Sequence, residues 1–307
     1  MTADSHASAV QPAALPSRAF SPLRGWHWSV RRELWEYRSL YIAPLAAAGV
    51  VLFAYILGTV HLKVSSHVNF GGLSAADKHD LLSIPYIVAE AVIVATALLV
   101  GFFYCLGALQ NERRERSILF WKSLPVSDLT TVLSKATIPL LVLPLTIFAI
   151  IVATHLIMFV FSGPIHALRG LNGAQGYDAP SLLRIWTVVG YILGVLPLWY
   201  APVWAWLLLV SGWARRMAFV WAVAPPLALC IIEKIAFDTS YFAAFLGDRL
   251  AGGVSEATNA TSKGRMLDLS QLDPAKFVAS PGLWLGLVIA ATLLAAAVSL
   301  RRYRDPM

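Results

Sequence analysis

NERRERSILFWKSLPVSD, residues 111–128, separates two long apolar runs of the chain. The segment opens with five consecutive charged residues, 112–116, and continues with the apolar residues Ile118–Trp121. Ser127 or Asp128 then provides an N-cap for a following helix. Charges that orient, apolar residues that insert and a helix cap together indicate a docking element between two membrane spans. We therefore expect this segment to take force from a soluble partner.

The composition assigns the chain to the membrane proteins. Of 307 residues, 58% are hydrophobic and 13% are charged, with a mean hydropathy of +0.67. A soluble domain has roughly 25% charged residues. The core of a soluble domain could not enclose the apolar surface of this chain, so a lipid bilayer must surround it. The two cysteines, Cys105 and Cys230, lie inside apolar runs. They indicate neither a disulfide scaffold nor a metal site.

Six apolar segments reach the length of about 20 residues that a membrane-spanning helix needs. We expect an all-α membrane protein with spans near Leu40–Val60, Ile84–Leu109, Ala136–Phe161, Leu182–Val210, Met217–Ile235 and Leu283–Leu300. Several spans contain prolines, which membrane helices tolerate because neighbouring groups satisfy the freed carbonyls. The prolines predict kinked packing, or a gating hinge at Pro197 and Pro202 or at Pro225 and Pro226.

The distribution of Lys and Arg predicts the orientation. Fifteen of these residues fall on the side that holds both termini and residues 111–128, and nine on the other side. Short loops rich in Lys and Arg stay in the cytoplasm. We therefore expect a multi-pass protein of the cell membrane, the bacterial inner membrane, with cytoplasmic termini. This topology explains the net charge of +7, so no nucleic-acid partner is expected.

Three regions follow from the order of segments. Residues 1–21 are rich in Ala, Ser and Pro and lack the features of a signal peptide, which predicts a disordered cytoplasmic tail. Residues 22–39 predict an amphipathic interfacial helix, and residues 40–307 the six-span domain. The apolar face of the interfacial helix is bordered by arginines and consists of Leu23, Trp26, Val30, Leu34 and Tyr37. This helix is either an ordinary juxtamembrane anchor or an elbow that also contacts the partner.

The longest outer loop is predicted at residues 236–281. Its first part is too apolar for a solvated loop and predicts a short helix in the outer leaflet near Tyr241–Leu246. Residues Gly252–Lys276 look like a flexible surface segment. The other outer loops are expected at 61–83 and 163–181.

No motif for catalysis or cofactor binding is present in the sequence. The chain lacks a P-loop, an HExxH pair and a serine nucleophile elbow. We therefore expect no enzymatic activity and no cofactor in this chain. An intramembrane enzyme with acids from separate helices is the alternative.

Two polar residues at membrane depth are candidates for a transport path. Glu90 and His155 each lie about two turns from the outer ends of their spans, about 9–10 Å at 1.5 Å per residue. Because intramembrane ionisable residues are costly and often functional, we expect either a shared polar spot in a path or two side chains that reach toward water.

The segment from Glu112 to Lys135 resembles the first cytoplasmic loop of permeases of the type-two ABC transporters, the export class. The matching positions are Glu112, Arg116, Ser117, Ile118, Leu119, Leu124, Pro125, Val126, Ser127 and Lys135. The family commonly has Gly-Thr where this chain has Arg116-Ser117. The amphipathic N-terminal helix, the six spans and the short helix in the last outer loop agree with the family in architecture.

The resemblance implies how the protein works. Two six-span subunits, alike or different, form a path, and two ATP-binding subunits dock beneath it, where ATP hydrolysis takes place. The segment 112–128 is then a coupling helix between spans two and three, with Glu112, Arg116, Pro125 and Ser127 shaping it. Its apolar anchors are Ile118, Leu119, Phe120 and Trp121. The alternatives are an ion-coupled secondary transporter or channel, and a membrane scaffold without transport.

Overall fold

The computed structural model describes residues 22–61, 75–114, 127–168, 179–259 and 269–303. These ranges are helical, and their only β pairing is an isolated bridge between Thr258 and Leu272. The elements, in chain order, are α1 (Pro22–Glu36), α2 (Ser39–His61), α3 (Ala75–Gly107), α4 (Gln110–Arg114), α6 (Asp128–Thr137), the π-helix η2 (Ile138–Val142), α7 (Leu143–Leu168), α8 (Ala179–Trp199), α9 (Ala201–Trp213), α10 (Ala218–Phe237), α11 (Tyr241–Ala251), α12 (Gly253–Ala257), the 3-10 helix η4 (Leu269–Gln271), α13 (Pro274–Ala279) and α14 (Pro281–Tyr303).

The predicted fold class is confirmed. Six stretches of helix are long and apolar enough to cross a membrane: Ser39–Gly58, Ser83–Arg114, Asp128–Phe161, Leu182–Trp199, Ala218–Phe237 and Pro281–Tyr303. The helix predicted at residues 22–39 is present as α1, and its place at the membrane surface stays a prediction. The protein is therefore a multi-pass helical membrane protein.

Several predicted boundaries differ from the structure because helices continue through polar residues. The third spanning helix begins at Asp128 instead of Ala136, and Lys135 lies inside it. Helix α3 begins at Ala75, inside the predicted first outer loop, and α7 continues to Leu168. Hydropathy marks where a chain is apolar, whereas a helix ends only where its backbone bonding ends.

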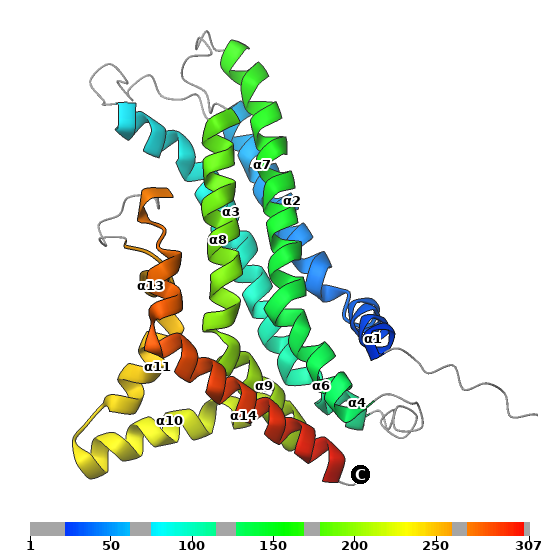
Figure 1. The fold of residues 1–307 in the computed structure, drawn as a ribbon. Helices are drawn as coiled ribbons and strands as arrows, with labels where there is room; N and C mark the ends of the chain where they lie inside the picture. Colours follow the sequence, from blue (N-terminus) through cyan, green and yellow to red (C-terminus); the bar gives the residue numbers. More distant parts are fainter. Residues whose placement is uncertain (1–21, 62–74, 115–126, 169–178, 260–268, 304–307) are drawn as a thin grey trace, which may run out of the picture.

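The helices α2, α3, α7 and α8 form a long bundle, with α9 and α14 crossing at its lower end in Figure 1. The main core lies between these helices and includes Ile93, Cys105, Ile151 and Leu208. Gly101 of α3 lies close to α7, since a Cβ atom there would lie 2.9 Å from Leu143 Cδ2 and would require that side chain to shift. Small residues at helix contacts allow such close approach in membranes.

Regular α-helix is interrupted at two proline-containing stretches, and at the second the predicted span Leu182–Val210 is wrong, because α8 ends at Trp199 and α9 is a separate, shorter helix. Around Pro139 the helix loosens into η2, where the Leu143 N–H donates to the Ile138 carbonyl five residues back. Between α8 and α9, the Val203 N–H donates to the Tyr200 carbonyl, so that the Trp199 carbonyl needs another donor. A π-bulge and a helix break are the usual responses to a missing proline N–H.

Arg249 of α11 supplies that donor. Its buried guanidinium donates to the Trp199 carbonyl at 3.1 Å and to the Gly282 carbonyl at 2.7 Å. It also lies over the Trp199 ring, 4.2 Å from the ring centroid. One side chain therefore fastens the segment 236–281 to the break between α8 and α9. Burial lowers the pKa of Arg249 from its ordinary value.

The segment 236–281 contains the predicted short helix as α11, but the predicted flexibility of Gly252–Lys276 is wrong for the described residues. The Lys276 Nζ donates to the carbonyls of Ser255 and Thr258, both at 2.8 Å. Phe277 is buried against Trp199. The polar composition of Gly252–Lys276 suggests a solvated loop. In the structure, however, a polar group of the segment, the Lys276 ammonium, bonds to backbone carbonyls of the same segment. Residues 260–268 lie outside the described residues.

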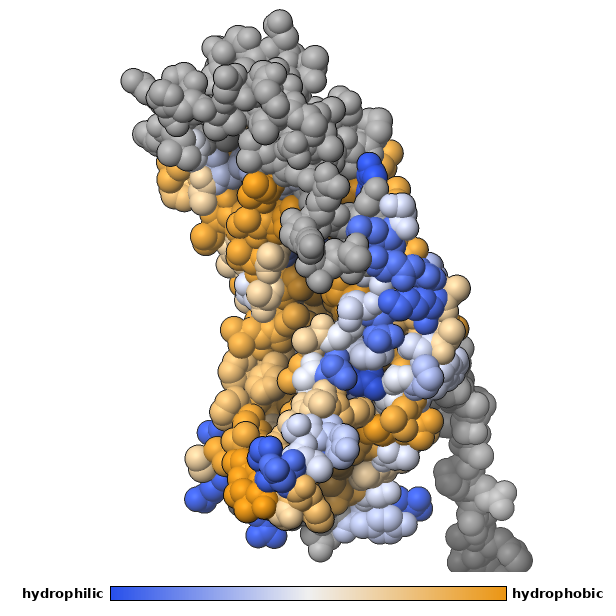
Figure 2. All heavy atoms as spheres, turned by 90° about the vertical axis from the view of Figure 1, so that its left-hand side faces the viewer, coloured by the Kyte–Doolittle hydropathy of each residue, from blue (hydrophilic) through white to orange (hydrophobic). Residues whose placement is uncertain are grey.

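Helix α10 diverges from the bundle in Figure 1. Left-handed residues, Met217 with φ 54° and Asp238 with φ 49°, reverse the chain at its two ends. Only 11% of its apolar window is buried. Figure 2 shows that apolar residues dominate the face seen there, with hydrophilic residues gathered in separate patches. This surface requires lipid or another protein as its surroundings.

Labelling from outside the cell tests the predicted orientation. In a variant without Cys105 and Cys230, single cysteines at Ser74 and Ser262 are expected to react with an impermeant maleimide in sealed cells. A cysteine at Ser127, an exposed residue, is expected to react only after the membrane is opened. Reaction of the Ser127 variant in sealed cells would contradict cytoplasmic placement of residues 111–128.

Candidate functional site

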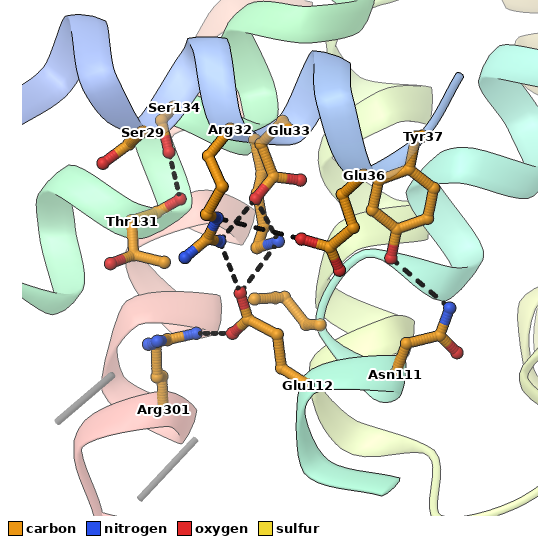
Figure 3. Close-up of polar contacts among 12 residues, drawn as sticks. Ser29, Arg32, Glu33, Glu36, Tyr37, Asn111, Glu112, Thr131, Ser134 and Arg301 are labelled. Atoms are coloured by element: carbon orange, nitrogen blue, oxygen red, sulfur yellow. Dashed lines mark hydrogen bonds and ion pairs between the residues drawn. The ribbon is translucent and has the colours of Figure 1, made fainter. Parts of the chain in front are cut away.

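Four charged residues from four helices meet in the interior beside the segment 111–128 (Figure 3). They are Glu33 of α1, Glu112 of α4, Lys135 of α6 and Arg301 of α14. Glu33 and Lys135 are fully buried, Glu112 is 3% exposed and Arg301 is 9% exposed. We call these four residues the buried network.

The buried network alternates acids and bases. The Lys135 Nζ lies 2.8 Å from Glu33 Oε1 and 3.0 Å from Glu112 Oε1. The Arg301 Nη1 donates to Glu112 Oε2 at 2.6 Å. Buried charges are tolerated only where each is paired and hydrogen-bonded, and here two acids face two bases.

Arg32 of α1 lies between the buried network and solvent, with its side chain 24% exposed. Its Nη2 lies 2.7 Å from Glu33 Oε1 and 3.1 Å from Glu112 Oε1. Its Nε lies 3.8 Å from the Glu36 carboxylate. Partial burial, and then the negative charge of Glu33, raise the pKa of Glu36 from its ordinary value. Arg32 therefore binds acids of both α1 and α4.

Tyrosines complete the polar contacts on the side of α3. The Tyr104 hydroxyl donates to Glu33 Oε2 at 3.0 Å, and Asn111 Nδ2 donates to the Tyr37 hydroxyl at 3.3 Å. The two tyrosine rings pack edge to face with centroids 4.9 Å apart. Both oxygens of Glu33 therefore have donors, which holds α1 against α3 and α6.

Arg301 connects the two ends of the 111–128 segment. Its Nη1 bonds to Glu112 on the amino-terminal side, and its Nε donates to Asp128 Oδ1 at 2.9 Å on the carboxyl-terminal side. Residues 115–126 lie between these two anchors and outside the described residues. One guanidinium of the last spanning helix thus fixes the spacing between Glu112 and Asp128.

The beginning of the segment is also attached to α9. The Arg113 Nη2 donates to the Ser211 carbonyl at 2.7 Å and to the Ala214 carbonyl at 3.2 Å. In return, Ser211 Oγ accepts hydrogen bonds from the Leu109 and Gln110 N–H groups. A cation at a helix C-terminus satisfies carbonyls that have no partner within the helix. These hydrogen bonds attach the turn between α3 and α4 to the end of α9.

The structure decides between the two predicted caps. Ser127 Oγ accepts the Thr130 N–H at 3.1 Å and is the N-cap of α6. Asp128 pairs with Arg301 instead. Of the predicted coupling residues, Glu112 lies inside the buried network, whereas the remaining ones, Arg116, Ile118, Leu119, Phe120, Trp121 and Pro125, lie outside the described residues.

Sequence reasoning missed Glu33 and the pairing of Lys135 and Arg301 with acids. The distribution of Lys and Arg predicts the two bases as loop cations of the cytoplasmic side. A signal was present for Glu33, because it stands four residues before Tyr37 and therefore borders the predicted apolar face of α1. Burying a carboxylate at that position costs free energy unless a base pairs with it. The position of Glu33 therefore predicts a buried base opposite it.

Of the two residues of the predicted polar spot, His155 of α7 contacts Tyr86 of α3. His155 is fully buried, and its Nε2 lies 3.3 Å from the Tyr86 carbonyl oxygen. The Tyr86 and His155 rings pack edge to face at 5.2 Å. Tyr86 is one helical turn before Glu90 on α3. His155 and Glu90 therefore lie within about one turn of each other in depth, and their direct pairing stays a prediction.

Crosslinking tests this pairing. Cysteines that replace Glu90 and His155 are expected to be joined by a short bifunctional maleimide, because the two helices pack together at this level. The matched control joins His155 to Leu99, an exposed residue of α3 more than two turns from Glu90, and is expected to remain uncrosslinked. Equal yields from the two pairs would contradict a shared polar spot.

Comparison with known proteins gives no relative for this chain. No protein-family model, curated protein or solved structure matches it. Among the described residues, no group of three or more His, Cys, Asp or Glu side chains is placed to hold a metal ion.

Proposed function

We propose that this protein is the transmembrane permease subunit of an ATP-driven ABC transporter of the type-two export class. Two such subunits form the path, and separate ATP-binding subunits drive it from the cytoplasm. The observation that supports this proposal is the attachment of the 111–128 segment, at both ends, to a buried network that joins the first and last helices of the chain.

The network is suited to transmit a displacement. Separating a buried ion pair leaves an uncompensated charge, at a cost of about 3–5 kcal/mol. A push on residues 115–126 therefore moves Glu112 and Asp128 without detaching them from Arg301. Lys135 and Glu33 carry the same displacement to α1, and Arg113 carries it to α9. A loop that served only as a connector needs none of these contacts.

The apolar residues Ile118–Trp121 are the proposed docking anchors. Interface energy concentrates in a few aromatic and apolar side chains that fill pockets of the partner. The sequence has no P-loop, and ATP is therefore bound and hydrolysed in the partner. The charged residues on either side orient the segment in a cleft of that partner.

Glu90 and His155 are the proposed polar residues of the path. They lie on α3 and α7, the same two helices that continue into Glu112 and, through α6, into Lys135. Movement of the buried network is thereby linked to Glu90 and His155, through the turn between α4 and α3 on one side and along α6, η2 and α7 on the other. Export is the direction implied by the resemblance of the segment Glu112–Lys135 to permeases of the export class.

Affinity purification in mild detergent tests the function. An ATP-binding protein is expected to copurify with the wild-type chain in about equal amount. Truncation of Trp121 to Ala is expected to weaken its retention by about 1–3 kcal/mol, as for an interface anchor. Lys63→Ala, in a predicted outer loop, serves as the control and is expected to retain the partner. Recovery of folded protein without any ATP-binding partner would contradict the proposal.

A further inference from the structure

Helix α1 has a second face that neither the core nor the buried network uses. Val30, Leu34 and Tyr37 pack against the main core, whereas Trp28 and Trp35 on the opposite side are 59% and 63% exposed. At 100° per residue, positions 28, 31 and 35 fall on one stripe of the helix. Large exposed tryptophans on one stripe indicate a binding surface.

Arg31 stands between the two tryptophans. Its guanidinium carbon lies 5.4 Å from the Trp28 ring centroid and 4.8 Å from that of Trp35, within cation–π distance. A guanidinium over aromatic rings keeps its N–H edge for a planar or tetrahedral anion. The stripe therefore combines an anion-binding group with two apolar platforms.

The acids of α1 do not neutralise this stripe. Glu33 is bound by Lys135 and Arg32, and Glu36 is paired with Arg32. Among the described residues, Arg31 forms no ion pair, and the exposed Arg38 follows the same helix. In the sequence RRELWEYR, residues 31–38, Glu33 is buried and the exposed Glu36 lies beside Arg32, whereas Arg31 and Arg38 are exposed.

The position of α1 determines which anion meets the stripe. Helix α1 ends at Glu36, and the first membrane span begins at Ser39, so α1 lies at the depth of lipid headgroups. Figure 1 shows α1 beside the bundle, above the end at which α4 and α6 meet. The stripe faces away from the bundle, because Val30, Leu34 and Tyr37 on the other side of α1 pack against the core. Tryptophan and arginine are the side chains enriched at this boundary.

We propose that Trp28, Arg31 and Trp35 bind the phosphate headgroup of an anionic phospholipid of the leaflet that contains α1. Arg31 donates to the phosphate oxygens, and the two indoles contact the glycerol and upper acyl region. This binding does not depend on the transport function. It fixes α1, and with it Glu33 of the buried network, at a defined depth of the membrane.

Native mass spectrometry of the full chain tests this inference with phosphatidylglycerol and phosphatidylcholine in equal amounts. Wild-type protein is expected to retain phosphatidylglycerol preferentially. Arg31→Gln is expected to lower its relative affinity about fivefold, as for loss of one basic residue at a charged surface. Trp28→Leu combined with Trp35→Leu is expected to lower it as well.

Arg302→Gln is the matched control. Arg302 is exposed and lies 5.6 Å from the centroid of the single Tyr303 ring, so the variant removes the same charge without the two-indole stripe. It is expected to bind phosphatidylglycerol like the wild type. Equal losses in Arg31→Gln and Arg302→Gln, or displacement of the lipid by excess inorganic phosphate, would overturn the proposed lipid site. Unchanged lipid retention by Arg31→Gln with loss of a copurifying protein would assign the stripe to a protein partner instead.

Discussion

Lys135→Met is expected to be the most destabilising single substitution in the buried network, lowering the free energy of unfolding by about 3–5 kcal/mol. The substitution removes the ammonium group that lies within 3.0 Å of both Glu33 and Glu112. Two buried carboxylates then share the remaining cations, and the side chain of Met adds packing but no charge. Unfolding of the purified chain by a denaturing detergent in mixed micelles measures the change.

Two further variants distinguish loss of charge balance from loss of packing. Adding Glu33→Gln to Lys135→Met removes one unbalanced carboxylate and is expected to recover part of the lost stability. Lys234→Met provides the matched control, because the Lys234 side chain is 63% exposed and pairs with Asp238 at 2.6 Å. Exposed pairs contribute about 0–1 kcal/mol, so little change is expected there. Wild-type stability of Lys135→Met would show that the network does not hold α1 to α6.

Arg301→Gln is expected to separate docking from coupling. The variant keeps the proposed anchors Ile118–Trp121, and the ATP-binding partner is expected to remain bound. It removes the guanidinium that joins Glu112 to Asp128. The expected loss of coupling free energy is about 1–3 kcal/mol, the usual range for linked sites.

Spin labels on exposed residues of two helices measure this coupling without knowledge of the substrate. Val160 of α7 and Ile235 of α10 are 66% and 80% exposed, and their distance is expected to change with ATP in the reconstituted wild-type complex. In Arg301→Gln the change is expected to shrink while the partner stays bound. Arg302→Gln, one residue further on, is the control and is expected to respond like the wild type. A full ATP response in Arg301→Gln would exclude Arg301 from transmission.

Glu112 cannot serve as a simple test of docking. The sequence suggests that charge reversal at Glu112 or Arg116 disturbs the contact with the partner. In the structure, the Glu112 carboxylate faces Lys135, Arg301 and Arg32. An arginine there would place four cations together and destabilise the chain before any docking takes place. Truncation of Trp121 is therefore the cleaner test of docking.

The sequence alone determined the membrane class, the presence of six spans and the helix α1. These features are local, because a span needs only about 20 apolar residues and an amphipathic helix only a repeating pattern. The Ser127 cap of α6 and the short helix α11 were predictable for the same reason. Each depends on residues within a few positions along the chain.

Only the tertiary structure decided how the charges are paired. The partners in the buried network are separated by 102 residues for Lys135 and Glu33 and by 189 residues for Arg301 and Glu112. Local patterns carry no information about contacts at such separations, and the same bases serve equally well as cytoplasmic loop charges under the positive-inside rule. Helix packing places Lys135 against the buried Glu33. It also places Arg301 within hydrogen-bond distance of Glu112 and Asp128, at the two ends of the 111–128 segment. Burial then made these pairs costly to separate, which is the physical basis of the proposed coupling.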